Sequence, residues 1–258
     1  MLTDAELDER AALVDELAGW AMERIPTRPG GDQIATKTSD ADWVTETDLA
    51  VERHVRAAVA ERFPDDRIVG EEYGASDHDG APATWYVDPV DGTTNYVHGL
   101  PLSSFSCAVL DDDGAAVGAV ADPYRGEVLS AVRGRGAFRN GTRTRCVETD
   151  TLVGGIFLTE LTMQSLWDGM PILMGRLAEA GCVTRILGTN ALSLASVGAG
   201  RALATVIGEF GPVDCHAGSL IAQEAGAAVR FEGKSIVCAA PGIVDELVGL
   251  LRGARNGG

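Results

Sequence analysis

Apolar residues recur at helical spacing near the start of the chain. This stripe consists of Leu7, Ala11, Val14, Ala18 and Ala21, at intervals of three or four residues, with Met22 beside the last of them. It predicts one face of an α-helix. Thr3-Asp4-Ala5-Glu6 precedes it with the spacing of a capping box. A Pro- and Gly-rich loop should follow from Pro26, and a second helix is expected over about 47–62.

The middle of the chain changes to short apolar runs separated by turn signals. Strands are expected at 67–70, 84–87, 102–110, 117–121, 127–132 and 137–138. Asp112-Asp113-Gly114, Asp122-Pro123 and Asn140-Gly141 lie between them and favour antiparallel hairpins. Pro89 lacks a backbone donor, so the strand that contains Trp85 should stop at Asp88.

From about residue 152 strands and helices alternate. Strands are expected at 155–158, 183–187, 202–207, 228–231 and 236–238, and helices at 164–180, 190–197, 214–225 and 243–251. Pro171 should mark a kink or a fresh first turn, and Arg252–Gly258 is expected to be a disordered tail. The order predicts an α/β (α+β) layered sandwich with an N-terminal half, 1–150, and a C-terminal half, 151–258.

Composition narrows the functional classes. The net charge of −17 argues against binding nucleic acid through its phosphates. The 258 residues include no apolar run long enough to span a bilayer, so we expect no membrane partner and a cytoplasmic protein. The five cysteines contain no CxxC pair, which predicts free thiols in a reducing compartment. A reactive Cys215 is the alternative.

The most informative stretch follows the strand at 84–87. Asp88 and Asp91 stand three residues apart around Pro89, and Gly92 allows close backbone approach. Two carboxylates at the end of a strand form a hard-oxygen site suited to Mg²⁺. The hydroxyl residues after Gly92 could open a helix whose free N–H groups face an anion. A turn with solvated acids is the other interpretation.

Further acids stand in distant segments. Asp48 and Asp214 each have the position of a helix cap, and Glu71 follows a predicted strand. If Glu71 and Asp214 came together with Asp88 and Asp91, the four carboxylates would repel one another and raise their own pKa values. Two or three Mg²⁺ ions would relieve that repulsion and could clamp the oxygens of an in-line displacement. No P-loop signature is present.

Together these segments resemble the inositol monophosphatase family of Mg²⁺-dependent, Li⁺-sensitive phosphatases. The matching motifs are Asp88-Pro89-Val90-Asp91-Gly92-Thr93, Gly70-Glu71-Glu72 and the Asp214 segment. The resemblance implies a five-layered αβαβα sandwich, a homodimer and Mg²⁺ as cofactor. It also implies hydrolysis of a phosphorylated polyol or sugar, namely inositol monophosphate, fructose 1,6-bisphosphate or both, by attack of an activated water.

The resemblance also assigns roles. Glu71, Asp88 and the Val90 carbonyl would hold one metal, and Asp88, Asp91 and Asp214 a second. The catalytic group would be Glu71, Thr93 and Asp48, with Asp48 hydrogen-bonded to the Thr93 hydroxyl. Substrate contacts would come from Asp91, Gly92, Thr93, Arg185, Gly188, Thr189, Asn190 and Asp214. A flap would carry Lys37, Asp40 and Asp42, with Asp40 or Asp42 reaching a third Mg²⁺ through water; a solvated loop is the alternative.

Several positions depart from the family pattern and leave the alcohol open. Val213 replaces a tryptophan, Asn190 replaces an alanine and His216 stands where a small residue is usual. His216 would contact the substrate or simply pack. Other candidate substrates are histidinol phosphate and 3′-phosphoadenosine 5′-phosphate. A non-catalytic binding role, for example in a transcription complex, is the remaining alternative.

Overall fold

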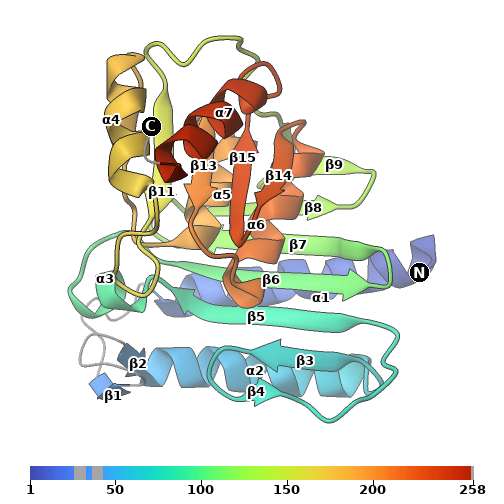
Figure 1. The fold of residues 1–258 in the computed structure, drawn as a ribbon. Coiled ribbons are helices and arrows are strands. Elements are labelled where there is room, and N and C mark those ends of the chain that lie inside the picture. The colour runs from blue at the N-terminus through green and yellow to red at the C-terminus, as the bar shows by residue number, and fades with distance from the viewer. Residues whose placement is uncertain (26–32, 37–42, 257–258) are drawn as a thin grey trace.

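The computed structural model describes residues 1–25, 33–36 and 43–256. Two large sheets alternate with three helical layers, which makes an αβαβα sandwich and confirms the predicted layered fold (Figure 1). The helices are α1 Asp4–Arg24, α2 Glu46–Arg62, α3 Thr93–Val97, α4 Met170–Glu179, α5 Asn190–Gly198, α6 Pro212–Glu224 and α7 Val244–Arg255.

The first two helices begin at capping boxes. Thr3 accepts a hydrogen bond from the Glu6 amide, and the Glu6 side chain accepts one from the Thr3 backbone, as the sequence predicts. In α2 the same exchange joins Thr45 and Asp48. Asp48 therefore lies in the first turn of α2, and Thr45 is the cap itself.

Eight strands form the larger sheet, in the order β10-β9-β8-β7-β6-β5-β3-β4. They are β3 Arg67–Gly70, β4 Gly74–Ala75, β5 Thr84–Asp91, β6 Ser104–Asp111, β7 Gly114–Asp122, β8 Glu127–Val132, β9 Gly136–Arg139 and β10 Thr142–Thr144. The strands from β5 to β10 pair as consecutive antiparallel neighbours, which confirms the predicted hairpins. A separate pair, β1 Gln33–Thr36 and β2 Trp43–Thr45, is also antiparallel.

The predicted end of β5 at Asp88 is wrong, because the strand continues through Pro89 to Asp91. Two features make the proline acceptable there. β3 pairs with β5 only as far as Val87, and pairing with β6 is interrupted between Asp88 and Asp91. The missing N–H of Pro89 therefore costs no ladder hydrogen bond.

Five strands form the smaller sheet, in the order β12-β11-β13-β15-β14. They are β11 Ile156–Glu160, β12 Val183–Arg185, β13 Ala204–Ile207, β14 Ala228–Glu232 and β15 Ser235–Ala239. β12 ends two residues earlier than predicted, because the Leu187 and Gly188 amides donate to the Glu160 side chain.

Two helix boundaries in this half also correct the sequence prediction. The helix expected from Gln164 starts only at Met170, so Pro171 lies in a fresh first turn and produces no kink. The tail expected to be disordered from Arg252 instead continues α7 to Arg255. Arg252 pairs with Glu232 at 2.8 Å, which fixes this end of the helix against β14.

Four apolar clusters fill the spaces between the five layers. One lies between α1–α2 and the large sheet, and another between that sheet and α5–α6. A third joins α5–α6 to the small sheet, and the fourth lies under α4 and α7. The middle layer is tightly packed: a Cβ on Gly118 of β7 would come within 3.0 Å of the Ala217 Cα in α6. Since α5 and α6 contact both sheets, the division near residue 150 into two halves stays a prediction.

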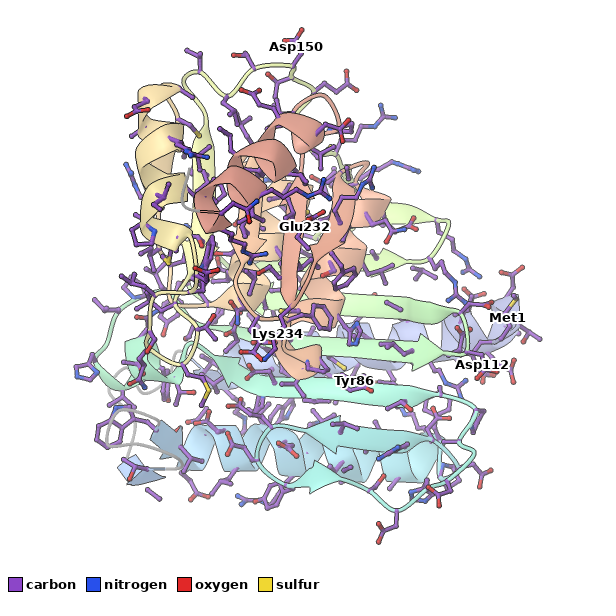
Figure 2. The ribbon with its side chains drawn as sticks, in the orientation of Figure 1. Met1, Tyr86, Asp112, Asp150, Glu232 and Lys234 are labelled. Atoms are coloured by element: carbon purple, nitrogen blue, oxygen red, sulfur yellow. The ribbon has the colours of Figure 1, made fainter. Side chains whose placement is uncertain are left out.

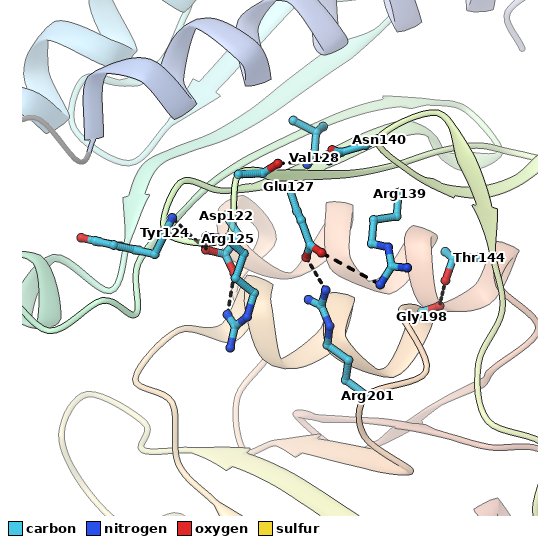
Figure 3. A network of polar contacts seen from close by, with 11 residues as sticks. Asp122, Tyr124, Arg125, Glu127, Val128, Arg139, Asn140, Thr144, Gly198 and Arg201 are labelled. Carbon is cyan, nitrogen blue, oxygen red and sulfur yellow. Dashed lines mark hydrogen bonds and ion pairs between the residues drawn. The ribbon is translucent and has the colours of Figure 1, made fainter.

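Polar contacts fasten the large sheet to the segment around α5 (Figure 3). Glu127 of β8 forms an ion pair with Arg201, just after α5, and lies 4.0 Å from Arg139. Thr144 donates to the Gly198 carbonyl over 3.3 Å. At the other end of the sheet, the N-terminal amine of Met1 lies 3.5 Å from Asp112 in the β6–β7 turn (Figure 2).

No helix in the described part of the chain is long and apolar enough to cross a bilayer.

Candidate active site

Two buried carboxylates stand at the end of β5. Asp88 is 5% exposed and Asp91 is 7% exposed. Asp88 Oδ1 accepts a hydrogen bond from the Val90 amide at 3.1 Å. Burial, followed by the charges of Glu71 and Asp91, raises the pKa of Asp88 well above its usual value. Burial and the charge of Asp214 do the same to the pKa of Asp91. Carboxylates from separate segments therefore share one electrostatic environment.

Glu71 is exposed in the turn after β3 and reaches Asp88. Its amide donates to the Val87 carbonyl at 3.1 Å. A second glutamate, Glu52 of α2, holds the turn from beneath, with its carboxylate accepting from the amides of Glu72 at 2.7 Å and Tyr73 at 3.1 Å. Glu52 is 0% exposed, and no local pattern in the sequence singles it out.

The expected hydrogen bond between Asp48 and Thr93 is present. Thr93 Oγ1 lies 3.3 Å from Asp48 Oδ1 and 3.0 Å from the Val90 carbonyl oxygen. Asp48 Oδ2 accepts from the Thr45 amide at 2.9 Å, so one carboxylate both closes the first turn of α2 and positions the Thr93 hydroxyl. The Val90 carbonyl keeps a second lone pair available.

Asp214 enters from the first turn of α6. Asn190 Nδ2 donates to Asp214 Oδ2 over 2.6 Å. Asp214 Oδ1 is buried and accepts no hydrogen bond from the described residues. Burial raises the pKa of Asp214, and the hydrogen bond from Asn190 opposes that rise. An acceptor oxygen withdrawn from water without a donor is an expensive feature unless a cation or water completes it.

The turn before α5 binds directly to Asp91. Thr189 Oγ1 and the Ala191 amide donate to Asp91 Oδ2 over 2.5 and 2.7 Å. Gly92 has φ +91°, and a Cβ there would stand 3.0 Å from the Gly188 carbonyl oxygen. The turn and the β5 motif are thus in van der Waals contact, which requires a glycine at 92.

A cavity of about 260 Å³ opens beside Asp91. It is lined by Asp91, Thr94, Asn95, Glu160, Leu161, Gln164, Ile186, Gly188, Thr189 and Asn190. Four predicted substrate residues are in that set. Arg185 is not: it is exposed on β12 and donates to the Thr184 carbonyl. Lys37, Asp40 and Asp42 lie outside the described residues.

Glu160 is a further lining residue that the sequence did not predict. It is 3% exposed and accepts from the Leu187 amide, the Gly188 amide and Ser193 Oγ. Burial raises its pKa to about 7, against the effect of these hydrogen bonds. The available sequence signal was a single acid that follows the strand-like run Ile-Phe-Leu-Thr.

His216 and Cys215 are packed rather than reactive. The His216 ring lies 5.0 Å from that of Tyr86 and 4.9 Å from that of Phe210, and burial lowers its pKa to about 4. Burial, with the nearby charge of Asp214, raises the pKa of Cys215 well above its usual value and keeps the thiol protonated. All five cysteines are free and buried, as predicted.

The donor set has the chemistry for a divalent cation. Glu71, Asp88, Asp91 and Asp214 supply only oxygen atoms, which hard cations such as Mg²⁺ prefer. No three His, Cys, Asp or Glu side chains in the described ranges converge as a finished coordination group. Asp91 and Asp214 each direct one oxygen to the start of α5 instead. The unpartnered Asp214 Oδ1 and the raised pKa values of Asp88, Asp91 and Asp214 nevertheless fit a bound cation.

Comparison with known proteins agrees with this geometry. Residues 7–247 match the model of the inositol monophosphatase family. A Nus factor SuhB from Pasteurella multocida is 35% identical over 227 residues, covering 84% of this chain and 85% of the relative. A fructose-1,6-bisphosphatase/inositol-1-monophosphatase from Thermotoga maritima is 37% identical over 204 residues, covering 79% and 77%. A solved Thermotoga maritima IMPase aligns at a TM-score of 0.87 and 31% identity, over 96% of this chain and 99% of that one.

Proposed function

The chain belongs to the inositol monophosphatase family and is a phosphatase, and from this premise we propose that it hydrolyses the monoester of a polyol or sugar with Mg²⁺ as cofactor. The observation that carries the proposal is the electrostatic contact among Glu71, Asp88, Asp91 and Asp214, which come from different segments of the chain. The adjoining polar cavity gives the alcohol a place to bind.

The metal ligands in this proposal are the four carboxylates and the Val90 carbonyl, holding two or three Mg²⁺ ions. Bound Mg²⁺ supplies Lewis acidity and neutralises phosphate charge. The remaining tasks fall to the chain itself. Glu71 and the Thr93 hydroxyl orient the attacking water, and Asp48 holds that hydroxyl through their hydrogen bond. The Gly92 and Thr93 amides bind phosphate oxygens.

The substrate side of the proposal rests on the cavity. Its polar lining consists largely of amides and hydroxyls, including Asn95, Asn190 and Thr189, which suit a hydroxyl-rich leaving group. Gly188 and Thr189 bind the alcohol, while Arg185, at the end of β12, is exposed to solvent and does not line this cavity. Relatives named for inositol-1-monophosphate and fructose 1,6-bisphosphate hydrolysis make these esters the first candidates. Histidinol phosphate and 3′-phosphoadenosine 5′-phosphate are the next to test.

Three finer properties belong to the same proposal. Li⁺ should inhibit by competing for a metal position. Five free thiols suit a reducing compartment such as the cytoplasm. A second copy of the chain should cover the exposed apolar side chains in and near β11 and β12 that lie outside the cavity, which include Ile156, Met163, Leu166 and Val183. Light scattering on the purified protein would measure the dimer directly.

A second candidate function is binding to a transcription complex. A relative named Nus factor SuhB favours it. The crowded carboxylates favour catalysis over a purely binding role. Like charges buried close together destabilise the fold unless a bound cation compensates them. Pull-down with Asp91→Asn as bait would support the binding role if a stoichiometric partner were retained.

Phosphate release from a panel of esters tests the main proposal. Purified protein with Mg²⁺ should hydrolyse at least one polyol or sugar phosphate, and chelation should stop the reaction. Asp91→Asn should fold, because an amide oxygen can still accept from Thr189 and Ala191, yet lose turnover. If the protein hydrolysed none of the esters, the proposal would be wrong.

A further inference from the structure

Glu160 is a buried carboxylate without an assigned role in the proposed site. It ends β11 and is 3% exposed. Among the described residues it forms no ion pair; its hydrogen-bond donors are the Leu187 amide at 3.1 Å, the Gly188 amide at 2.6 Å and Ser193 Oγ at 2.5 Å. A carboxylate is an acceptor-only group, so both of its oxygens can receive N–H and O–H donors at once.

The backbone that Glu160 holds carries the groups that touch the carboxylates. Thr189 donates to Asp91, and Asn190 donates to Asp214. The same turn is fixed on its other side by Asn95, whose Nδ2 donates to the Leu187 carbonyl at 2.7 Å. Displacing the turn would therefore move donors at two proposed metal ligands together, and would reshape the wall of the substrate cavity.

We propose that Glu160 is a positioning residue, which holds the 187–189 backbone so that Thr189 and Asn190 orient Asp91 and Asp214 toward cation and substrate. This inference rests on the proposed phosphatase site. Partners that orient metal ligands commonly contribute about 10- to 100-fold to metal affinity or activity. A carboxylate that acts on the ligands only through this turn should lie at the lower end of that range.

Glu160→Gln is the decisive variant, because glutamine keeps the volume but turns one acceptor into a donor that faces an amide N–H. Asp111→Asn is the matched control. The Asp111 side chain is also buried and accepts from two amides, those of Leu2 and Asp113, each at 2.9 Å. It differs from Glu160 in pairing with Arg133 at 2.7 Å, so its amide variant reports the loss of a buried, paired carboxylate far from the site. It is the last residue of β6, at the opposite end of the large sheet from α3 (Figure 1).

Two measurements separate positioning from stability. Calorimetric titration with Mg²⁺ alone should show an affinity about 10-fold lower in Glu160→Gln than in the wild type, with Asp111→Asn unchanged. On the best ester of the panel at saturating Mg²⁺, Glu160→Gln should raise KM more than it lowers kcat. Wild-type Mg²⁺ affinity and KM in Glu160→Gln, or equal losses in both variants, would overturn the inference.

Two provisions keep the test decisive. If Glu160→Gln does not fold, Ser193→Ala removes one donor to the carboxylate and should weaken Mg²⁺ binding about threefold, a smaller effect than loss of the acceptor itself. No change in that variant would count against the inference. If the wild type hydrolyses no ester, the proposed function fails, whereas the Mg²⁺ titration still decides on Glu160.

Discussion

Asn190 and Asp214 connect the first residue of α5 to the first turn of α6 through one hydrogen bond of 2.6 Å. The bond fixes Asp214 Oδ2 and leaves Oδ1 buried with no donor in the described part of the chain. One oxygen is thus held in place and the other remains free for a cation. A carboxylate oriented in this way binds a metal more tightly than a freely rotating one.

Asn190→Ala should therefore weaken Mg²⁺ binding by about 10-fold. The variant also removes a hydrogen bond that opposes the rise in the pKa of Asp214, so protons should compete with Mg²⁺ at higher pH than in the wild type. Calorimetric titrations at about pH 6 and about pH 8 would measure both effects. Equal Mg²⁺ affinity in the two proteins would contradict the role given to Asn190.

Gly92→Ala should lose both stability and activity. The residue has φ +91°, and a Cβ would lie 2.9 Å from the Leu102 carbonyl oxygen and 3.0 Å from that of Gly188. Backbone strain alone costs about 1–2 kcal/mol, and the two contacts add to it. Gly114→Ala is the control, because Gly114 has φ +100° and nothing within 4 Å of the place where the new methyl group would stand. Urea denaturation should show a larger loss of unfolding free energy in Gly92→Ala than in Gly114→Ala. Equal losses in the two variants would exclude the steric clash.

Glu160 should make the metal-free protein less stable as the pH rises. Its pKa is about 7 in the folded chain, above the ordinary value of 4.5, because burial disfavours the charged form. The folded state therefore holds this proton more tightly than the unfolded state. The associated stability is complete below about pH 4.5 and is lost as the pH rises through 7, with a total on the order of 3 kcal/mol.

Chemical denaturation in chelator between about pH 4.5 and about pH 8 would measure this slope. Glu160→Gln should be flatter than the wild type over that interval, because the variant has no proton to lose. The other acids are common to both proteins, so their contributions cancel in the difference. If the unfolding free energies of the two proteins changed in parallel with pH, Glu160 would have the same pKa in the folded and unfolded chains.

Mg²⁺ should stabilise the folded protein more at about pH 8 than at about pH 5. Burial and neighbouring carboxylates raise the pKa values of Asp88 and Asp91, so protons occupy these groups at low pH. At a concentration about 100-fold above its dissociation constant, a ligand that binds only the folded state adds about 2.7 kcal/mol. Thermal melts with and without Mg²⁺ would reveal the shift, and Asp88→Asn should reduce it. If Mg²⁺ raised the melting temperature equally at both pH values, the cation would bind away from Asp88 and Asp91.

Local signals in the sequence predicted much of the fold. The capping box at Thr3 and the turn signals between the hairpin strands each depend on a few neighbouring residues. The interactions that produce these features join residues within one or two turns of the chain. The αβαβα order and the Asp48–Thr93 hydrogen bond came from the family resemblance.

The remaining features depend on contacts that no local pattern encodes. Pro89 stays within β5 because the neighbouring ladders happen to be open at that point. Glu52 and Glu160 look like ordinary acids in the sequence, and only the folded chain shows the amides they accept from. Arg185 adjoins the substrate turn in sequence but lies outside the cavity, because β12 directs it into solvent.

Diffraction from crystals soaked in Mn²⁺ tests the central claim most directly, since Mn²⁺ accepts the same oxygen ligands as Mg²⁺ and scatters anomalously. The account predicts anomalous peaks bounded by Glu71, Asp88, Asp91 and Asp214, and their loss in Asp91→Asn. An active, Mn²⁺-saturated protein whose anomalous peaks all lie away from these four carboxylates would contradict it.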